Sequence, residues 1–444
     1  MNKLLVISQH FPPEIGAASN RMEQLTLRLA QRGWTLYVVT AQPSYPEPAL
    51  YQDVSDEGER DRLRQMGIHL FRTPSVARLL SGKAARAANQ LLFLAFALLI
   101  SLWICLRHRV GICLTTSPPF PVNLVGWFLA TFFRVKWVME VRDLWPDSLL
   151  AVTRIQASHP LFKLLKRLER LFYRTARQVV VVTQAFKEQL VQSGVPEHKL
   201  AVITNGIPDW VWPYLREKEG RKEESSPSHL HQDPLDEAEM IRVVYIGNLG
   251  LAQGLEQILK VAQFFDRQNV PKERDNGDQQ PPGTGSIHFY FVGEGLAKPH
   301  LMEQAKKEGL TNVHFIPGQT DKQTLAAWYQ KAHVGVVCLK PDPLFNTVIP
   351  SKVFEYGAWG LPILFIGSGE GAEVVQKYGL GLRVDYDTIA IIEGLLTLFR
   401  QFRERNHSQV EQFRRDFSWD VLIEDYISLL SRQLSAKGIK IRER

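Results

Sequence analysis

The sequence predicts an α/β fold of two doubly wound domains, each a parallel sheet covered by helices. Three observations carry this prediction. The chain has 444 residues, a length that suits two domains. A strand–loop–helix–strand pattern opens at residues 4–8 and begins afresh at Ile241. Between the two patterns, residues 217–239 are charged, rich in Ser, Pro and His, and without hydrophobic periodicity, which is typical of a linker.

The composition favours an anionic small molecule or membrane surface as partner over a nucleic acid. Lys and Arg number 53 against 46 acidic residues, giving a net charge of +7 and a pI near 9.2. The chain contains no Arg-rich tail, zinc-finger spacing or RNA-binding aromatic motif. Its three cysteines, Cys105, Cys113 and Cys338, lie in apolar runs without metal or disulfide spacing, as expected of reduced thiols in a cytoplasmic protein. We expect no signal peptide, because only LLVIS is apolar before the polar QHFPPE.

The first domain opens with a candidate phosphate-approach loop. Residues 4–8 and 34–40 read as buried strands, and residues 19–32 between them read as a helix. Gly16 would allow close backbone approach to a ligand, and Arg21 lies at a helix start that suits phosphate. An ordinary turn with a capping serine is the alternative. Residues 42–59, rich in Pro and acids, are interpreted as a flexible flap.

Residues 89–106, NQLLFLAFALLISLWICL, contain no charge and are short for a membrane span. Basic residues on both sides argue against simple spanning. Two interpretations stay open, a helix buried against the sheet and a monotopic helix dipping into the inner leaflet. Residues 161–177 form a basic amphipathic helix that suits a membrane surface or a solvated outer face. Taken together, the two segments favour membrane association.

A second polar cluster follows the strand predicted at residues 137–141. Arg142 and Asp143 would lie at the carboxyl end of this strand, where an acceptor could bind or a proton be handled. A structural ion pair is the alternative. The first domain's other expected elements are strands at 112–115, 179–183 and 200–203 and helices at 122–133 and 184–192.

The second domain begins with another glycine loop. After the strand at 241–246, Gly247 and Gly250 bracket a tight turn into a helix at 255–265. This loop matches neither the dinucleotide nor the Walker pattern. Further elements are expected at 287–292, 298–308, 313–316, 324–332, 334–339, 389–403 and 420–434, with a low-complexity insert at 266–286.

Residues 339–371, LKPDPLFNTVIPSKVFEYGAWGLPILFIGSGEG, form the strongest candidate site. A helix starting near Ser351 would carry Lys352 and Glu355 beside free backbone N–H groups. Lysine supplies a point charge and glutamate supplies acceptors for a sugar diol, so the helix would suit a nucleoside diphosphate. The alternative is that Ser351 caps a core helix and both charges are solvated.

The order and spacing of several motifs resemble the GT-B glycosyltransferases, and more narrowly glycosyltransferase family 4. The nearest resemblance is to bacterial O-antigen, capsule and colanic-acid-type enzymes, including N-acetyl-fucosamine transferase-like members. The resemblance covers nearly the whole chain and rests on HFPPEIG, TTSPPF, EVRDLWPDS, TNGI, YIGNLGLAQGLE, FVGEG, IPSKVFEYGAWGLPI and FSWD.

The resemblance implies two Rossmann-like domains facing across a cleft, with the nucleotide-sugar donor in the second. Glu355 would accept from the ribose hydroxyls, and Lys352 would lie near the diphosphate. Catalysis would retain the anomeric configuration, need no metal or cofactor, and rest on Asp143, Lys352 and Glu355. The other donor-side candidates are Gly16, Arg21, Gly247, Asn248, Gly250, Gln253, Glu294, Ile316, Pro317, Thr347 and Ser351. The acceptor-side candidates are His10, Arg142, Asp143 and Asn205.

The chain departs from the family pattern at three positions. Asn248 and Gln253 occupy places where the family often has an arginine and a lysine, so Lys352 or Arg21 would have to compensate. Thr347 stands where the first of two glutamates eight positions apart would fall, which leaves the sugar open.

These inferences predict a membrane-associated glycosyltransferase at the cytoplasmic face, peripheral or monotopic. It would transfer a sugar from a nucleotide-sugar, UDP-linked in our interpretation, to a polyprenyl-diphosphate-linked or other glycan acceptor. The alternatives are a soluble nucleotide-sugar epimerase and a degenerate nucleotide-sugar-binding partner. The expected domains are 1–215 for the acceptor, 216–240 as linker, 241–410 for the donor, and 411–444 packing back on the first domain.

Overall fold

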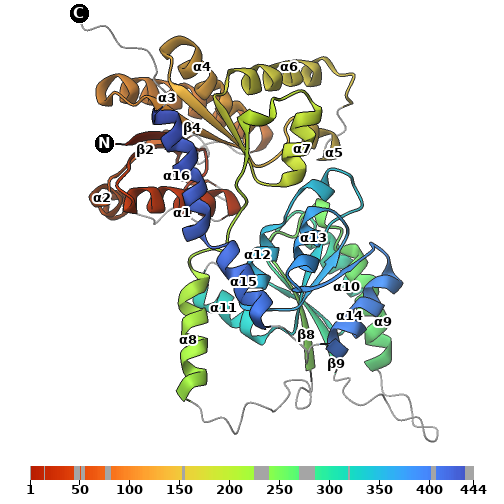
Figure 1. Ribbon diagram of the computed structural model, residues 1–444. Helices are drawn as coiled ribbons and strands as arrows, with labels where there is room; N and C mark the ends of the chain where they lie inside the picture. The colour runs from red at the N-terminus through yellow and green to blue at the C-terminus, as the bar shows by residue number, and fades with distance from the viewer. Residues whose placement is uncertain are drawn as a thin grey trace, which may run out of the picture. The chain divides into compact units, whose positions relative to one another are not determined.

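A computed structural model describes residues 2–14, 16–44, 51, 56–75, 82–152, 156–224, 240–269, 286–318, 321–401 and 407–435. The chain divides into two compact units. The first domain comprises Met1–Gly206 and Ser418–Arg444, and the second comprises Ile207–Phe417. Figure 1 shows their elements in chain order.

The first domain is built on a seven-stranded parallel sheet of order β3-β2-β1-β4-β5-β6-β7. Its strands are nearly continuous apolar runs, as expected where helices cover both faces. The strand order reverses between β1 and β4, the switch point at which doubly wound sheets bind ligands. The strands are β1 (Lys3–Ile7), β2 (Thr35–Ala41), β3 (Ile68–Thr73), β4 (Ile112–Ser117), β5 (Lys136–Val141), β6 (Gln178–Val181) and β7 (Leu200–Val202).

The helices of the first domain cover this sheet, and the C-terminal helix α16 (Trp419–Ser435) joins them by packing on α1 (Ala17–Gln31). Helix α1 buries Met22, Leu25 and Leu29, one apolar stripe of a 3.6-residue period. The remaining helices are α2 (Asp56–Gln65), α3 (Gly82–His108), α4 (Asn123–Phe133), α5 (Asp147–Val152), α6 (Pro160–Thr175) and α7 (Gln184–Gln192).

The second domain repeats the architecture with a six-stranded parallel sheet of order β10-β9-β8-β11-β12-β13. Its switch point lies between β8 and β11. The strands are β8 (Met240–Ile246), β9 (Ser286–Val292), β10 (Val313–Ile316), β11 (Val334–Cys338), β12 (Ile363–Ile366) and β13 (Gly381–Val384).

Two apolar clusters flank this sheet. One involves α8 (Val211–Glu224), α11 (Lys322–Lys331), α12 (Ser351–Trp359), α13 (Glu370–Lys377) and α15 (His407–Asp416), and the other involves α9 (Glu256–Asn269), α10 (Lys298–Lys307) and α14 (Thr388–Gln401). The fold therefore confirms the prediction of two doubly wound α/β domains.

The domain limits differ from those expected from the sequence. The first domain ends at Gly206 rather than at residue 215, and residues 216–224 belong to helix α8 rather than to a linker. The reason is that Val211 and Leu215 are buried in the second domain's core. Likewise α15 packs on α12 in the second domain, so the chain returns to the first domain only at Ser418.

Several expectations fall on parts of the chain outside the described residues. These are most of the predicted flap at 42–59, residues 225–239 of the linker, residues 270–285 of the insert and the basic tail from 436.

Helix α3 contains the segment that the sequence left between two interpretations. Its residues 88–108 are long and apolar enough to cross a membrane by length and composition, the single such helix among the described residues. One face is buried, with Phe93, Ala97 and Ile104 nearly inaccessible, and the helix packs on β1, β2 and β3. The other face is open, since Leu99 is 62% exposed and Leu106 is 69% exposed. The buried face agrees with a helix packed on the sheet, and entry into the inner leaflet stays a prediction.

Candidate functional site

The candidate donor site of the second domain lies where strands β8 and β9 end. Gly247 follows β8 with φ of +130°, and Gly293 follows β9 with φ of +156°. A side chain on Gly293 would clash with the carbonyl oxygen of Gly247, so only glycine lets the two loops touch. The contact is fixed by the backbone bond from Gly247 N to Val292 O at 2.8 Å. The glycines therefore place main-chain atoms, rather than side chains, at the ends of these two strands.

Lys352 reaches this edge from the first turn of α12. Its Nζ lies 4.4 Å from the centre of the Tyr245 ring, within cation–π range. A Cβ on Gly247 would lie 3.0 Å from the same Nζ, so the bare glycine makes room for the ammonium. Burial lowers the pKa of Lys352 to about 8, and the nearby Glu355 opposes that shift. The lysine is therefore held without a close carboxylate to neutralise it.

Glu355 lies one turn further along α12 and is held by α11. The hydroxyl of Tyr329 donates to Glu355 Oε2. Burial raises the pKa of Glu355, while the Tyr329 hydrogen bond and the charges of Lys352 and Lys322 act in the opposite direction. Lys352 and Glu355 thus lie three residues apart on one face of α12, and both are half-buried.

The N-terminus of α12 has no side-chain cap. Pro350 is the N-cap and Ser351 is the first helical residue, with no side-chain capping bond. The alternative in which Ser351 caps a core helix is therefore wrong. The positive end of the helix dipole and its leading N–H groups remain available beside Lys352.

The loop after β8 carries no cation of its own. Asn248 is exposed, and a Cβ on Gly250 would lie 2.6 Å from Gln253 Oε1. That oxygen is buried and has no hydrogen-bond partner in the described part of the chain. Lys340 crosses the far end of the loop, because its backbone N bonds Ala252 O at 3.0 Å and its Cγ lies 2.9 Å from where a Gly254 Cβ would be.

Lys340 was missed at the sequence level, although a signal existed. It is the second residue after β11, and β8 and β11 flank the switch point of this sheet. Lys340 and Lys352 therefore approach the loop after β8 from two other elements.

The remaining donor-side candidates follow strands β9, β10 and β11 in the chain, and Glu294 and Thr347 form local hydrogen bonds. Glu294 accepts from Lys298 Nζ at 2.8 Å and from Gly318 N at 3.1 Å, which ties the β9 and β10 loops together. Thr347 donates to Leu344 O at 2.6 Å inside its own 3-10 turn. Strand β10 ends at Ile316, which is half-buried, and Pro317 follows it and is exposed.

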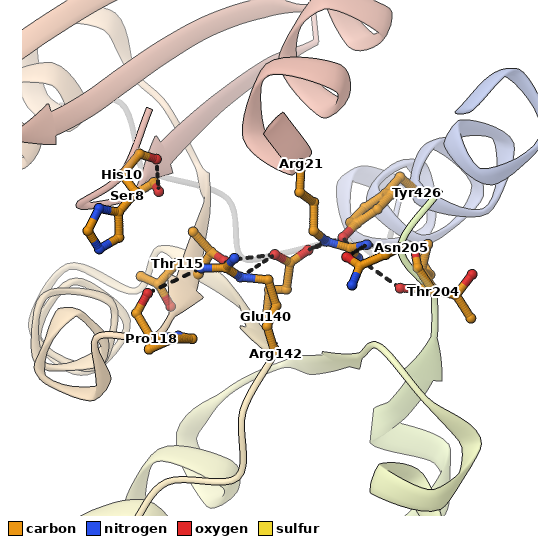
Figure 2. A network of polar contacts seen from close by, with 12 residues as sticks. Ser8, His10, Arg21, Thr115, Pro118, Glu140, Arg142, Thr204, Asn205 and Tyr426 are labelled. Carbon is orange, nitrogen blue, oxygen red and sulfur yellow. Dashed lines mark hydrogen bonds and ion pairs between the residues drawn. The ribbon is translucent and has the colours of Figure 1, made fainter. Parts of the chain in front are cut away.

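Arg21 does not belong to a phosphate site. Its Nε lies 3.1 Å from Glu140 Oε2, and both side chains are almost fully buried (Figure 2). The other four N–H groups bond the carbonyls of Ile203 and Thr204, Asn205 Oδ1 and the Tyr426 hydroxyl, at 2.6–3.2 Å. All five guanidinium donors are used, so the expected compensating role of Arg21 is corrected. Asn205, an acceptor-side candidate, is a partner in this network.

Glu140 is the centre of that network (Figure 2). Burial alone would raise the pKa of Glu140, but the charges of Arg21 and Arg142 hold it below its ordinary value. Thr116 donates to one carboxylate oxygen at 2.7 Å, and the Tyr426 hydroxyl donates to the other. The group is a satisfied buried charge at the end of strand β5.

Arg142 and Asp143 continue from the same strand. Arg142 donates to Thr116 Oγ1 at 2.8 Å and to Pro118 O at 3.2 Å, so it spans the ends of β4 and β5. Its ion-pair partner is Glu140, at 3.7 Å, rather than Asp143. Burial raises the pKa of Asp143.

A histidine and a carboxylate are paired near the switch point of the first domain's sheet. His10 Nδ1 lies 2.7 Å from Glu14 Oε2, and Ser44 N donates to the other oxygen of that carboxylate at 2.7 Å. The Ser8 hydroxyl donates to His10 O at 2.6 Å (Figure 2). Gly16 is the N-cap of α1 without a side-chain cap. The structure thus collects His10, Arg142 and Asp143 at carboxyl strand ends of one sheet.

Two relatives with similar sequences are named as glycosyltransferases. Residues 16–206 match the glycosyl transferase 4-like domain, and residues 241–401 match glycosyl transferases group 1. WcaI of Escherichia coli K12, named for colanic acid biosynthesis, is 22% identical over 81% of both chains. WbjE of Pseudomonas aeruginosa, named as a glycosyltransferase, is 24% identical, and the match spans 64% of this chain and 65% of WbjE.

Solved structures give the same fold. The sucrose-phosphate synthase of Thermosynechococcus elongatus has a TM-score of 0.69 at 16% identity, over 98% of this chain and all of the other. Anabaena HepE, solved with UDP, has a TM-score of 0.61 at 15% identity, over 97% and 100%. The fold is therefore that of the GT-B enzymes. With the two family models, it makes the chain a member of the family 4 glycosyltransferases.

Removing the central charge of the first domain should destabilise it strongly. In Glu140→Gln, Arg21 and Arg142 would remain buried without a counter-charge. We expect a loss of about 3–5 kcal/mol in the free energy of unfolding, measured by urea titration. The matched control is Glu424→Gln, because Glu424 also links α16 to α1 through Arg32 at 2.7 Å but is 60% exposed. Its loss should stay below about 1 kcal/mol. Equal stabilities of the two variants would contradict this account.

Proposed function

We propose that this glycosyltransferase moves a sugar from a UDP-linked donor to a polyprenyl-diphosphate-linked or other glycan acceptor in cell-surface polysaccharide synthesis. The observation that carries the proposal is that Lys352 and Glu355 lie together on the first turns of α12, which have no side-chain cap. The UDP in the similar HepE structure and the colanic acid name of WcaI support it.

The donor would be held by charge and by main-chain groups. A diphosphate leaving group gains negative charge as the sugar C1–O bond breaks, so donors fixed beside it lower the barrier. Lys352, Lys340 and the N–H groups at the start of α12 can supply that stabilisation without a metal ion. Glu355 would accept hydrogen bonds from the two ribose hydroxyls, since an ionised carboxylate offers about four lone pairs.

The transfer itself would retain the anomeric configuration. The bond from C1 to the phosphate oxygen breaks, the acceptor oxygen bonds C1 from the same face, and the acceptor proton passes to the departing phosphate oxygen. This route needs no protein nucleophile. His10, Arg142 and Asp143 of the first domain would bind the acceptor and orient its hydroxyl.

Three neighbouring helices of the first domain would contact the membrane. Helix α4 packs on both α3 and α6, and each exposes large apolar side chains. Basic residues accompany them in the sequence, as expected at an anionic inner leaflet. The exposed apolar residues are Leu91, Phe96, Leu99, Trp103, Leu106, Leu124, Phe132, Phe133, Leu161, Leu164 and Leu171.

Removing either charge of α12, or Lys340, should weaken nucleotide binding. We expect Lys352→Ala, Glu355→Ala and Lys340→Ala each to lower UDP affinity about tenfold or more and to reduce sugar transfer. UDP at a hundred times its Kd should stabilise the wild type by about 2.7 kcal/mol in thermal-shift assays. Lys331→Ala, at the exposed end of α11, is the control. Binding of UDP without any sugar transfer would favour the alternative of a degenerate nucleotide-sugar-binding protein. Formation of an epimerised nucleotide-sugar would favour the alternative of an epimerase.

The pH dependence of binding should follow Lys352. Since the pKa of Lys352 is lowered to about 8, the free protein loses this charge as the pH rises above 8. UDP affinity, measured by calorimetry between pH 6.5 and 9.5, should fall over that range. Lys352→Arg stays charged throughout, so its profile should be flat. The same fall in both proteins would assign the effect to another group.

Charging the open face of α3 should release the protein from membranes. Trp103→Glu with Leu99→Glu places two carboxylates on residues that are 51% and 62% exposed, so folding should persist. We expect wild-type protein to float with phosphatidylglycerol-containing vesicles and this variant to stay behind. Leu296→Glu, at an 84% exposed position of the second domain, should float like the wild type. Wild-type protein that never floats would contradict membrane association.

A further inference from the structure

The Tyr329 hydroxyl has a contact that packing alone does not require. We infer that Tyr329 is a positioning residue, which holds the Glu355 carboxylate in the orientation that recognises the ribose of the donor nucleotide. This inference rests on the proposed function, in which Glu355 binds the ribose diol. Tyr329 itself would not touch the substrate.

The Tyr329 ring is fixed on several sides. Only 2% of the residue is exposed. The ring stacks on Trp359, with centroids 5.7 Å apart and planes at 4°, and lies edge-on to Tyr356 at 5.8 Å and 61°. Trp210 closes another side, with centroids 6.0 Å apart. A ring so confined points its hydroxyl at one place, and that place is Glu355 Oε2.

The contact also divides the two carboxylate oxygens between protein and ligand. Within the described part of the chain, Oε2 receives the tyrosine hydrogen bond, while no hydrogen bond is formed to Oε1. Glu355 is half-buried, and in our proposal Oε1 is the oxygen that accepts from the ligand. A ribose diol supplies two such donors.

The phenol can only act as a donor here. Burial and the charge of Glu355 raise the pKa of Tyr329 well above its ordinary value, so the proton stays on the tyrosine oxygen. Burial raises the pKa of Glu355, and the Tyr329 hydrogen bond counters that shift. Without the hydroxyl, the carboxyl group would protonate at a higher pH and lose acceptor capacity.

Comparison with neighbouring tyrosines separates positioning from packing. The Tyr356 hydroxyl accepts a hydrogen bond from Ile246 N at 2.9 Å, which serves the sheet. The Tyr378 hydroxyl donates to Asp416 Oδ2 at 2.7 Å in the same domain, at the end of α15. Tyr378 is also buried, at 6% exposure, and the carboxylate that it contacts is not part of the proposed donor site. Tyr378→Phe is therefore a matched control for Tyr329→Phe.

The experiment compares the full chain's affinity for UDP and for 2′,3′-dideoxy-UDP by calorimetry. Tyr329→Phe keeps the stacked ring and removes one oxygen. We expect it to weaken UDP binding about tenfold and to leave dideoxy-UDP binding within about twofold of the wild type. Glu355→Gln should show the same selective loss, and the double variant should lose little more. In Tyr329→Phe, UDP affinity should also begin to fall at a higher pH as the solution is acidified. Tyr378→Phe should change neither affinity.

Three outcomes would overturn the inference. Equal loss for both nucleotides in Tyr329→Phe would mark a structural role. Unchanged UDP binding in Tyr329→Phe, alongside a selective loss in Glu355→Gln, would remove Tyr329 and leave the proposed function intact. A wild type that binds UDP no better than dideoxy-UDP, with Glu355→Gln also unaffected, would remove the ribose role of Glu355 and the inference with it.

Discussion

The first domain depends on the buried ion pair between Arg21 and Glu140. Two charges removed from water are costly unless every donor and acceptor is matched, and here all five guanidinium N–H groups are. The partners come from β5, from residues 203–205 and from α16. The last two segments lead out of the domain at Gly206 and return to it at Ser418. One guanidinium therefore anchors both chain crossings to helix α1.

The second domain shows the opposite use of charge. At the end of β8 the glycines bring main-chain groups together, and Lys352 lies on a tyrosine ring instead of in a close ion pair. A cation already neutralised by the protein would gain little from a diphosphate, whereas a diphosphate would stabilise the charged form of Lys352, which burial disfavours. The cluster around Arg21 thus stabilises the first domain, whereas the charges on α12 are those that we propose bind the nucleotide.

The sequence predicted what depends on local pattern. Apolar runs identified most strands, and the start of α12 at Ser351 followed from the break at Pro350. It did not predict β3 or β13, which are edge strands with partly exposed patterns. It also assigned Arg21 to phosphate, because partners 119 and 405 residues away leave no local trace. Tyr329 was missed for the same reason, since only the folded domain brings α11 against α12.

The departures at Asn248 and Gln253 then have a physical explanation. What a diphosphate requires is positive charge within a few ångströms, and Coulomb attraction does not depend on which element carries it. Lys340 crosses the end of this loop, with its Cγ 2.9 Å from where a Gly254 Cβ would lie. In the proposed donor site, Lys340 and Lys352 would supply the positive charge that Asn248 and Gln253 do not. Under this proposal, the absence of cations from the loop does not by itself make the donor site degenerate.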